Sequence, residues 1–562
     1  MSAPNTSFNL STVFDTVARA VPEREVLVWG DLRLRYRDMN ERIDGLARHL
    51  VEHGLACDDA RGDLPGHRSH QSHIGLYLRN GNEYLESMVA GYRARAAPVN
   101  VNYRYVDEEL HHLLSEAQVR ALVYHAAFAP QVAALRSRLP QLDVLVQVAD
   151  DSGNELLPGA VDYETAVRTP ARPTMPSPNG DDLYILCTGG TTGLPKAVLW
   201  RQDDIFVRAM GGTPFGATEP FADYEQLADA AREAGDGMRL LMTAPFMHGA
   251  AQWSTFHVIT TGGTIVLPAD NTRLDWPEAL EITAREGVIS VPVIGDAMAR
   301  PMLAALQAGD FDLSGLAAIN NGGAPLSPAV RSRLLAALPH VVLLDAVGSS
   351  ETGIQMNHAS VADAEADTAV FSPDATTTVV DDGLTRELRP GEGQGWLATT
   401  GRVPQGYLGD AAKTARTFPV IAGERCSIPG DRAIARADGR IELLGREGLT
   451  INSGGEKIFV EEVERAVAAH PDVLDVVVVG RPSERWGDEV VALVELDPAG
   501  ATTDAGLLAE CAEHIARYKL PKTILRCSGI VRSPAGKADY SWAREYARSA
   551  EEPARRGPAR AC

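Results

Sequence analysis

A short segment rich in glycine and threonine carries the strongest chemical signal in the chain. An apolar strand predicted over residues 183–187 runs into a turn and then reaches a lysine. Its polar and flexible residues are Thr188, Gly189, Gly190, Thr191, Thr192, Gly193 and Lys196. Glycine lets backbone N–H groups approach an anion closely, threonine hydroxyls add donors, and lysine supplies a mobile positive charge. The pattern predicts a cradle for phosphate oxygens.

Two other interpretations of this segment are weaker. An ordinary P-loop ends in Gly-Lys-Ser/Thr, whereas here Pro195 precedes Lys196 and Ala197 follows it. A flexible surface loop would rarely place so many glycines and threonines directly before a lysine.

Four further segments accompany the phosphate loop. They are a glycine turn at 321–325, a polar run at 345–353, the tripeptide 429–431, and residues 534–537 near the end of the sequence. Each alone is a weak signal, because glycine turns are common and a single Asp or Lys is usually solvated. Their order and spacing together are the stronger observation.

The composition limits the class of protein. A chain of 562 residues is too long for one core, so two or more domains are expected. The net charge of -22 argues against a nucleic-acid partner. The six scattered cysteines form no Cys-x-x-Cys pair, which fits a reducing cytoplasm. No signal peptide and no apolar run long enough to cross a membrane is recognised, so a cytoplasmic location is expected.

Strand-like and helix-like stretches alternate, which predicts an α/β fold. Helices are expected over 40–53, 460–470 and 505–517, and strands over 74–78, 240–243, 264–267, 317–320, 341–345, 475–480 and 489–496. Functional groups in such sheets gather where strands end. The pattern changes near residues 445–448, which indicates a hinge before a small α+β domain; one continuous domain is the alternative.

A polar segment at 57–73 contains His67, His70 and His73. A metal site is one interpretation of these three histidines. Their spacing within a loop that contains Gly, Pro and Ser favours a solvated insertion instead.

Taken together, these segments resemble the adenylate-forming superfamily of acyl-CoA synthetases, luciferases and peptide-synthetase adenylation domains, over residues 12–546. The run Ile451-Asn452-Ser453-Gly454-Gly455-Glu456-Lys457 is typical of the acyl-CoA branch. Segments 295–301, 347–353 and 532–537 are most similar to bacterial steroid side-chain CoA ligases.

The resemblance implies an architecture and a reaction. The fold would be α/β, with a large multi-layer domain (1–445) that has mixed sheets and a β-barrel-like subdomain. A small mobile α+β domain (446–548) and a disordered tail (549–562) would follow. ATP, Mg²⁺ and coenzyme A would convert a carboxylic acid, through an acyl-adenylate, to acyl-CoA, AMP and pyrophosphate. A homodimer is possible.

The resemblance also implies roles for single residues. Lys537 would reach the carboxylate and α-phosphate, Glu351 would hold Mg²⁺, and His248 would lie between the acyl site and the thiol tunnel. Thr192 and the other phosphate-loop residues with Lys196 would cover the β- and γ-phosphates. The remaining nucleotide contacts would be Gly323, Ala324, Pro325, Asp345, Ser349, Ser350, Asp431 and Arg446. Gly454, Gly455 and Glu456 would line the pantetheine channel. Simple structural roles remain open for two of these residues: a buried histidine for His248 and a hinge ion pair for Arg446.

The chain departs from the family pattern at four positions. Gly190 removes a hydroxyl from the phosphate loop, Ala197 replaces a glycine, and Val347 replaces an aromatic residue that would stack on adenine. Gly448 stands where relatives carry a hinge Asp or Lys, and glycine permits rotation there.

Small residues in 244–253, 295–298 and 320–323 predict room for a bulky apolar acid, of sterol type or with a long branched chain, in preference to an ordinary fatty acid. Close chain packing is the alternative explanation of the small residues. Loading of a carrier protein, luciferase-like chemistry and a non-catalytic nucleotide-binding protein are the other functions considered.

Overall fold

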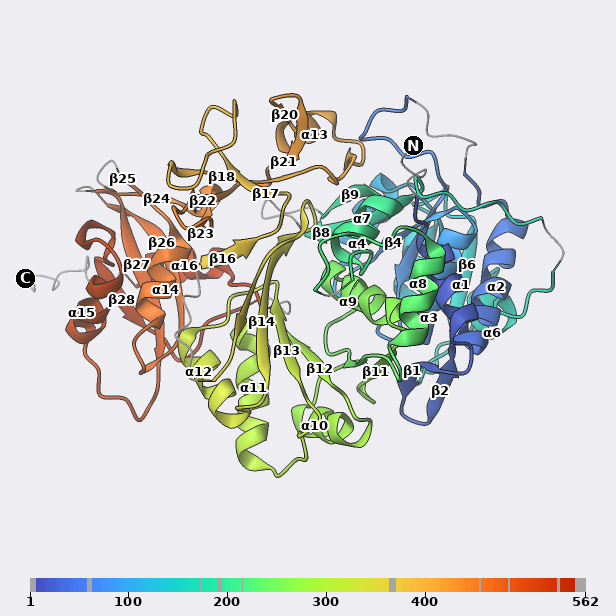
Figure 1. Cartoon of the computed structure of the whole chain (residues 1–562), viewed down its shortest axis with the longest axis horizontal. Coiled ribbons are helices and arrows are strands. Elements are labelled where there is room, and N and C mark those ends of the chain that lie inside the picture. Colours follow the sequence, from blue (N-terminus) through green and yellow to red (C-terminus); the bar gives the residue numbers. More distant parts are fainter. Residues whose placement is uncertain are drawn as a thin grey trace, which may run out of the picture.

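Three sheets organise the part of the chain that the computed structural model describes, namely residues 7–57, 63–171, 174–189, 195–214, 216–362, 370–453, 456–483, 486–532 and 536–550. Two sheets belong to the sequence before residue 447, and the third to the sequence after it. In Figure 1 the third sheet lies at one end of the molecule, beside strands β16, β22 and β23. The α/β fold class predicted from the sequence is confirmed.

The largest sheet has fifteen strands and mixed pairing. Its order is β2 (Leu32–Arg35), β1 (Glu25–Trp29), β11 (Thr264–Leu267), β10 (Arg239–Leu241), β12 (Ser290–Val293), β13 (Ala318–Gly322), β14 (Val342–Ser349), β15 (Gly353–Ser360), β16 (Val370–Pro373), β23 (Ile441–Arg446), β22 (Asp431–Ala435), β18 (Gly393–Thr400), β21 (Glu424–Ser427) and β20 (Val420–Ile421), with β17 (Thr377–Val380) beside β18. Strands β10 to β14 run parallel, whereas those from β15 onward pair antiparallel.

The expected barrel-like subdomain corresponds to the antiparallel part, from β16 to β20. Among the described residues its strands form an open path that does not close into a barrel. The likeness to a barrel therefore stops short of closure, because β20 and β16 lie at different ends of this path instead of pairing with each other.

The second sheet has eight strands and carries the phosphate-loop hairpin. Its order is β19 (Gly406–Tyr407), β9 (Pro195–Arg201), β8 (Leu183–Gly189), β4 (Ala97–Asn100), β3 (His73–Tyr77), β5 (Val119–His125), β6 (Val144–Val148) and β7 (Val161–Asp162). The strands from β8 to β7 are parallel and apolar, as expected for a sheet buried on both faces.

In the third sheet, the apolar run of residues 476–479 contributes side chains to both faces. The order of this sheet is β25 (Glu456–Ile458), β24 (Ile451–Ser453), β27 (Gly487–Leu496) and β26 (Val473–Ser483), with β28 (Thr523–Arg526) beside β27. In β26, Val476 and Val478 pack toward α14 and α15, whereas Val477 and Val479 pack toward α16. Side chains alternate across a strand, so helices on both faces explain why the run has no polar residue.

Helices cover these sheets. Before residue 447 they are α1 (Leu10–Ala20), α2 (Tyr36–Glu52), α3 (Asn82–Arg93), α4 (Asp107–Glu116), α5 (Ala129–Arg136), α6 (Tyr163–Ala166), α7 (Gln202–Ala209), α8 (Tyr224–Glu233), α9 (Gly249–Thr260), α10 (Trp276–Arg285), α11 (Gly295–Ala308), α12 (Pro328–Ala337) and α13 (Ala411–Thr417). After it come α14 (Val460–Ala468), α15 (Asp504–His514) and α16 (Tyr540–Ser549). No helix in the described ranges is long and apolar enough to cross a membrane.

Candidate functional site

The predicted phosphate loop joins two antiparallel strands. In this β8–β9 hairpin, Thr188 lies opposite Lys196 and Gly189 opposite Pro195. The loop residues Gly190, Thr191, Thr192 and Gly193 fall outside the described residues. Lys196 Nζ lies 3.0 Å from Asp410 Oδ2, and both side chains are about one-third exposed. Asp410 therefore holds the loop's cation at the surface, where an incoming phosphate could compete for it.

The run 345–353 is a hairpin, which differs from the loop expected after a strand. Strand β14 continues through Ser349 and turns at residues 350–352 into β15, with Ser349 opposite Gly353. The Thr352 hydroxyl accepts from Ser349 N at 3.0 Å and lies 3.0 Å from the Ser349 hydroxyl. Antiparallel pairing with β15 extends the strand, so Asp345 lies within β14 and Glu351 at the tip of the hairpin.

Three side chains fix the position of Glu351. The phenol of Tyr407 donates to Glu351 Oε1 at 2.7 Å, the Ser427 hydroxyl donates to its backbone oxygen at 2.6 Å, and Trp200 Nε1 donates to the neighbouring Ser350 O at 2.8 Å. Burial, together with the charge of Glu351, raises the pKa of Tyr407, so the phenol remains a donor at neutral pH. The Tyr407–Glu351 contact was not predicted from the sequence.

The predicted adenine wall packs against the start of α11. Gly323 adopts a positive φ of 80°. A Cβ on Gly295, whose φ is also positive at 55°, would lie 2.7 Å from Pro325 O and 2.9 Å from Ala324 Cβ. Glycine at 295 is thus needed for both its conformation and its close approach to this turn.

Asp345 is fully engaged by its neighbours. Its two carboxylate oxygens accept from Arg331 Nη1 at 2.5 Å and from Asn321 Nδ2 at 2.8 Å. Asn321 Oδ1 in turn accepts from Gly295 N at 2.8 Å. Asp345 therefore supports the adenine-wall turn, and Val347, two residues on, packs on the apolar cluster of the antiparallel strands.

Asp431 and Arg446 lie opposite each other on β22 and β23. Arg446 Nε donates to Asp431 Oδ1 at 3.2 Å, and the nearby Asp431 charge raises the pKa of Arg446. The ion-pair alternative considered for Arg446 is therefore present. The pair stands immediately before the predicted hinge, where residues 447–449 form a single 3₁₀ turn.

Lys537, which belongs to the small domain, lies close enough to Arg446, Glu351 and Asp431 to interact with their charges. Burial lowers its pKa, Arg446 lowers it further, and Glu351 and Asp431 act in the opposite direction. The adjacent Gly536 has a φ of 74°, and a Cβ there would lie 3.0 Å from Ile294 O. A cation from the small domain thus joins the acidic residues of the large domain, although residues 533–535 lie outside the described part.

His248 lies at the N-terminus of α9 as a neutral side chain. Burial lowers its pKa to about 4, and Arg104 and Lys537 add to this effect. Its Nε2 is buried without a hydrogen-bond partner among the described residues. Nε2 of His49 is buried without a partner among the described residues too, so this atom does not by itself distinguish a functional from a structural histidine.

Two of the glycines expected to make room for an acyl group, Gly249 and Gly295, are close-packed instead. A Cβ on Gly249 would lie 2.6 Å from Leu186 Cδ2, and Gly295 is in contact with the adenine-wall turn. The close-packing alternative therefore applies to both, whereas Gly322 is open, with only Ala346 O at 3.7 Å.

Glu456 occupies β25, an edge strand of the small sheet, opposite Ser453. Its predicted channel partners Gly454 and Gly455 lie outside the described residues.

The end of the histidine-containing segment packs against the large domain, so the expected solvated insertion is wrong for residues 70–73, whereas Asp63, Pro65 and Arg68 are exposed. His70 and His73 are buried, and His67 O accepts from Gly409 N at 2.8 Å. Cys57, His70 and Asp182 come together at metal-ligand spacing. Arg95 donates to both oxygens of Asp182, at 2.9 and 3.0 Å, and so supplies the positive charge that a metal ion would bring.

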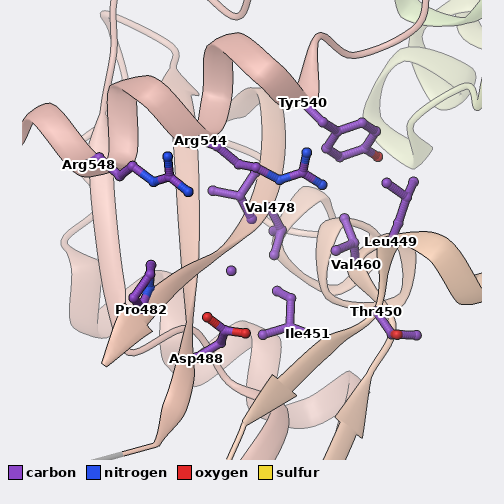
Figure 2. Close-up of a pocket in the computed structure, with 12 residues that line it drawn as sticks. Leu449, Thr450, Ile451, Val460, Val478, Pro482, Asp488, Tyr540, Arg544 and Arg548 are labelled. Atoms are coloured by element: carbon purple, nitrogen blue, oxygen red, sulfur yellow. The ribbon is translucent and has the colours of Figure 1, made fainter. Parts of the chain in front are cut away.

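A separate cavity of about 220 Å³ lies within the small domain, between α16 and strands β24 and β26. Figure 2 shows Arg544 and Arg548 extending over it from α16, with Asp488 on the opposite side. Its lining contains none of the predicted site residues.

Comparison with known proteins agrees with this geometry. Residues 14–408 match the family model described as AMP-binding enzyme, and residues 462–537 match the AMP-binding enzyme C-terminal domain. The chain belongs to the AMP-binding enzyme family.

Two relatives align over nearly their whole length. The medium-chain acyl-CoA ligase Mig of Mycobacterium avium is 53% identical, covering 97% of this chain and 100% of that protein. The 3-oxocholest-4-en-26-oate–CoA ligase of Rhodococcus rhodochrous is 36% identical, covering 96% of each. Among solved structures, anthranilate CoA ligase AuaEII in complex with anthranoyl-AMP superimposes with a TM-score of 0.76 at 20% identity, covering 98% of this chain and 99% of that one, which shows the shared fold.

Proposed function

We propose that this chain is an AMP-forming acyl-CoA ligase that uses ATP and coenzyme A. The observation that carries the proposal is the convergence of Glu351, the Asp431–Arg446 pair and Lys537, drawn from both sides of the hinge. A carboxylate and the α-phosphate of ATP repel each other, so their reaction requires positive charge at the point of transfer. Lys537 supplies that charge when the small domain is docked.

The first step is transfer of AMP to the acid. Asp431 accepts from the ribose hydroxyls, the turn Gly323–Pro325 contacts adenine, and Ser349 and Ser350 present the Glu351 hairpin. Lys196 leaves Asp410 for the β- and γ-phosphates, which the loop of Thr188 to Gly193 covers. The carboxylate oxygen bonds to the α-phosphorus, the bond to the pyrophosphate oxygen breaks, and Lys537 stabilises the negative charge.

Glu351 is suited to hold Mg²⁺. Carboxylate oxygen is the preferred ligand of this hard cation. Tyr407 engages Oε1, and Oε2 has no hydrogen bond in the described part of the chain. When bound, Mg²⁺ would neutralise charge on the phosphates.

The second step is thioester formation. The small domain (446–548) turns about residues 446–448, which withdraws Lys537 and brings Gly454, Gly455 and Glu456 to the pantetheine channel. The CoA sulfur attacks the acyl carbon and AMP leaves. His248, which is neutral, lies between the acyl group and the thiol.

The acid is a medium-chain fatty acid in this proposal. The 53% identity to a medium-chain acyl-CoA ligase supports it, and the close packing at Gly249 and Gly295 removes part of the space expected for a sterol. The steroid side-chain ligase at 36% identity makes a steroid acid the second candidate.

Release of pyrophosphate and AMP tests the proposal. Purified protein is given ATP and Mg²⁺ with octanoate, palmitate, benzoate or a steroid whose side chain carries a carboxylate at C26. Each acid is tested with and without CoA. Acid-dependent pyrophosphate release, with acyl-CoA only when CoA is present, is expected. Absence of AMP with every acid would overturn the proposed function, and the preferred acid distinguishes the two substrate candidates.

A further inference from the structure

Two side chains of the small domain hold the last strand of the large domain across the hinge. Glu461 Oε1 accepts from the backbone N of Arg446 at 3.3 Å. One helical turn later, Arg465 Nη2 donates to the backbone O of Leu443 at 3.1 Å. Both residues belong to α14, which begins after the hinge turn, whereas both backbone groups belong to β23, which ends before it.

The shape of β23 makes this contact possible. A register shift between Arg432 and Ala433 sets three β23 residues, 443 to 445, against two of β22 and turns backbone groups outward. Gly445 has a φ of 139°, and a Cβ there would lie 2.3 Å from Glu461 Oε2. Glycine at this position therefore admits the carboxylate. Glu461 Oε2 is buried without a hydrogen-bond partner among the described residues, so placing the carboxylate here costs energy.

We propose that Glu461 and Arg465 form a latch that holds the small domain in the orientation where Lys537 faces the phosphate site. The proposal rests on the proposed two-step function. The latch joins the backbone of β23, which ends at Arg446, to side chains of α14, so rotation about residues 446–448 breaks both hydrogen bonds. Docking of Gly536 on Ile294 is the second contact of the same orientation. Neither Glu461 nor Arg465 is itself a predicted substrate contact: Glu461 hydrogen-bonds to Arg446 at its backbone N–H, and both residues act as positioning residues through Lys537.

Separate assay of the two half-reactions tests the latch. Loss of one hydrogen bond of this kind corresponds to about a 3- to 10-fold change in an equilibrium. Glu461→Ala and Arg465→Ala should therefore slow pyrophosphate release about 3- to 10-fold. Thioester formation from chemically prepared acyl-AMP and CoA should be unchanged or faster. Glu461→Gln retains an acceptor for Arg446 N and should restore most of the adenylation rate.

Two matched variants sharpen the test. Asp504→Asn removes an exposed ion pair with Arg526 that lies wholly within the small domain, and it should alter neither half-reaction. Gly445→Ala pushes on the latch from the large domain and should resemble Glu461→Ala. Gly445→Ala should reduce the rate of pyrophosphate release less in the Glu461→Ala background than in the wild-type background, because the two residues are in contact.

The outcomes separate the latch from the function itself. Equal loss of both half-reactions in Glu461→Ala, or no loss in either, overturns the latch. Wild-type protein that makes neither acyl-AMP nor acyl-CoA overturns the proposed function instead.

Discussion

At the scale of single residues, Tyr407 fixes the carboxylate proposed to hold the metal ion. Its hydroxyl is the donor to Glu351 Oε1 at 2.7 Å, and its raised pKa keeps it protonated. A hydrogen bond to a charged group contributes about 1.5–3 kcal/mol. Tyr407→Phe should lower kcat/KM for ATP about 10-fold in the pyrophosphate assay. Tyr546→Phe, on α16, serves as the control, and equal activity of the two variants would contradict this role.

Lys537 provides the second prediction at this scale. It is proposed to act only while adenylate forms. Lys537→Ala should reduce pyrophosphate release by about 10²-fold or more, as for loss of one electrostatic stabiliser. It should largely spare thioester formation from supplied acyl-AMP. Comparable losses in both half-reactions would be inconsistent with the swinging of the small domain.

At the scale of elements, the sequence predicted those with a clear local pattern. Strand β11 and the start of α14 occur as expected, and β3 begins one residue before its predicted start. Apolar periodicity fixes such elements locally. The continuation of β14 through Ser349 was missed because it depends on β15, a partner with no signal in the polar run itself.

The difference between local patterns and long-range contacts also applies to the candidate site. Glu351, Asp431, Arg446 and Lys537 were predicted, and they are near one another in the fold. Tyr407 lies 56 residues from Glu351, and Asp410 lies 214 residues from Lys196. Long-range partners of this kind follow from tertiary packing and leave no local signal in the sequence.

The hinge turn gives a prediction at the scale of elements. Gly448 is not among the glycines with positive φ, and a Cβ there would meet no atom within 4 Å. Gly448→Ala should therefore keep the rate of pyrophosphate release within about twofold of wild type. Any larger effect should appear in thioester formation, for which the small domain is proposed to take its second orientation. A marked loss of adenylation in this variant would show that the docked state needs glycine at 448.

At the scale of the whole molecule, the two sides of the hinge contribute unlike groups to one site. The large domain provides Glu351 and Asp431, and the small domain provides Lys537. Against a net charge of -22, anionic substrates require local cations, and Lys196, Arg446 and Lys537 are the ones proposed for this role. Docking and withdrawal of one lysine can therefore change the site from adenylation to thioester formation.

Buried titratable groups make the stability of the whole molecule depend on pH. Burial lowers the pKa of four histidines to about 4, from 6.5: His49, His125, His248 and His257. Between pH 4 and 6.5 the unfolded chain binds more protons at these groups, so stability rises with pH. Burial also raises the pKa of Glu83 to about 7 and of Glu464 to about 8, from 4.5. At these carboxyls the folded chain binds more protons, so stability falls as pH rises toward 8.

Below pH 6.5 the protons bound by the four histidines in the unfolded chain outweigh those bound by the two carboxyls in the folded chain, and above pH 6.5 the carboxyls become the larger contribution. The urea midpoint should therefore be highest near pH 6.5 and lower at both pH 5 and pH 8. Glu464→Gln keeps an acceptor for Val478 N but cannot ionise, so it should remove about 1–2 kcal/mol of the decline between pH 6.5 and 8. Urea titrations of both proteins at the three pH values check this. A midpoint that rises steadily to pH 8 would show that Glu464 is ionised in the folded protein, with Tyr540 as its hydrogen-bond donor.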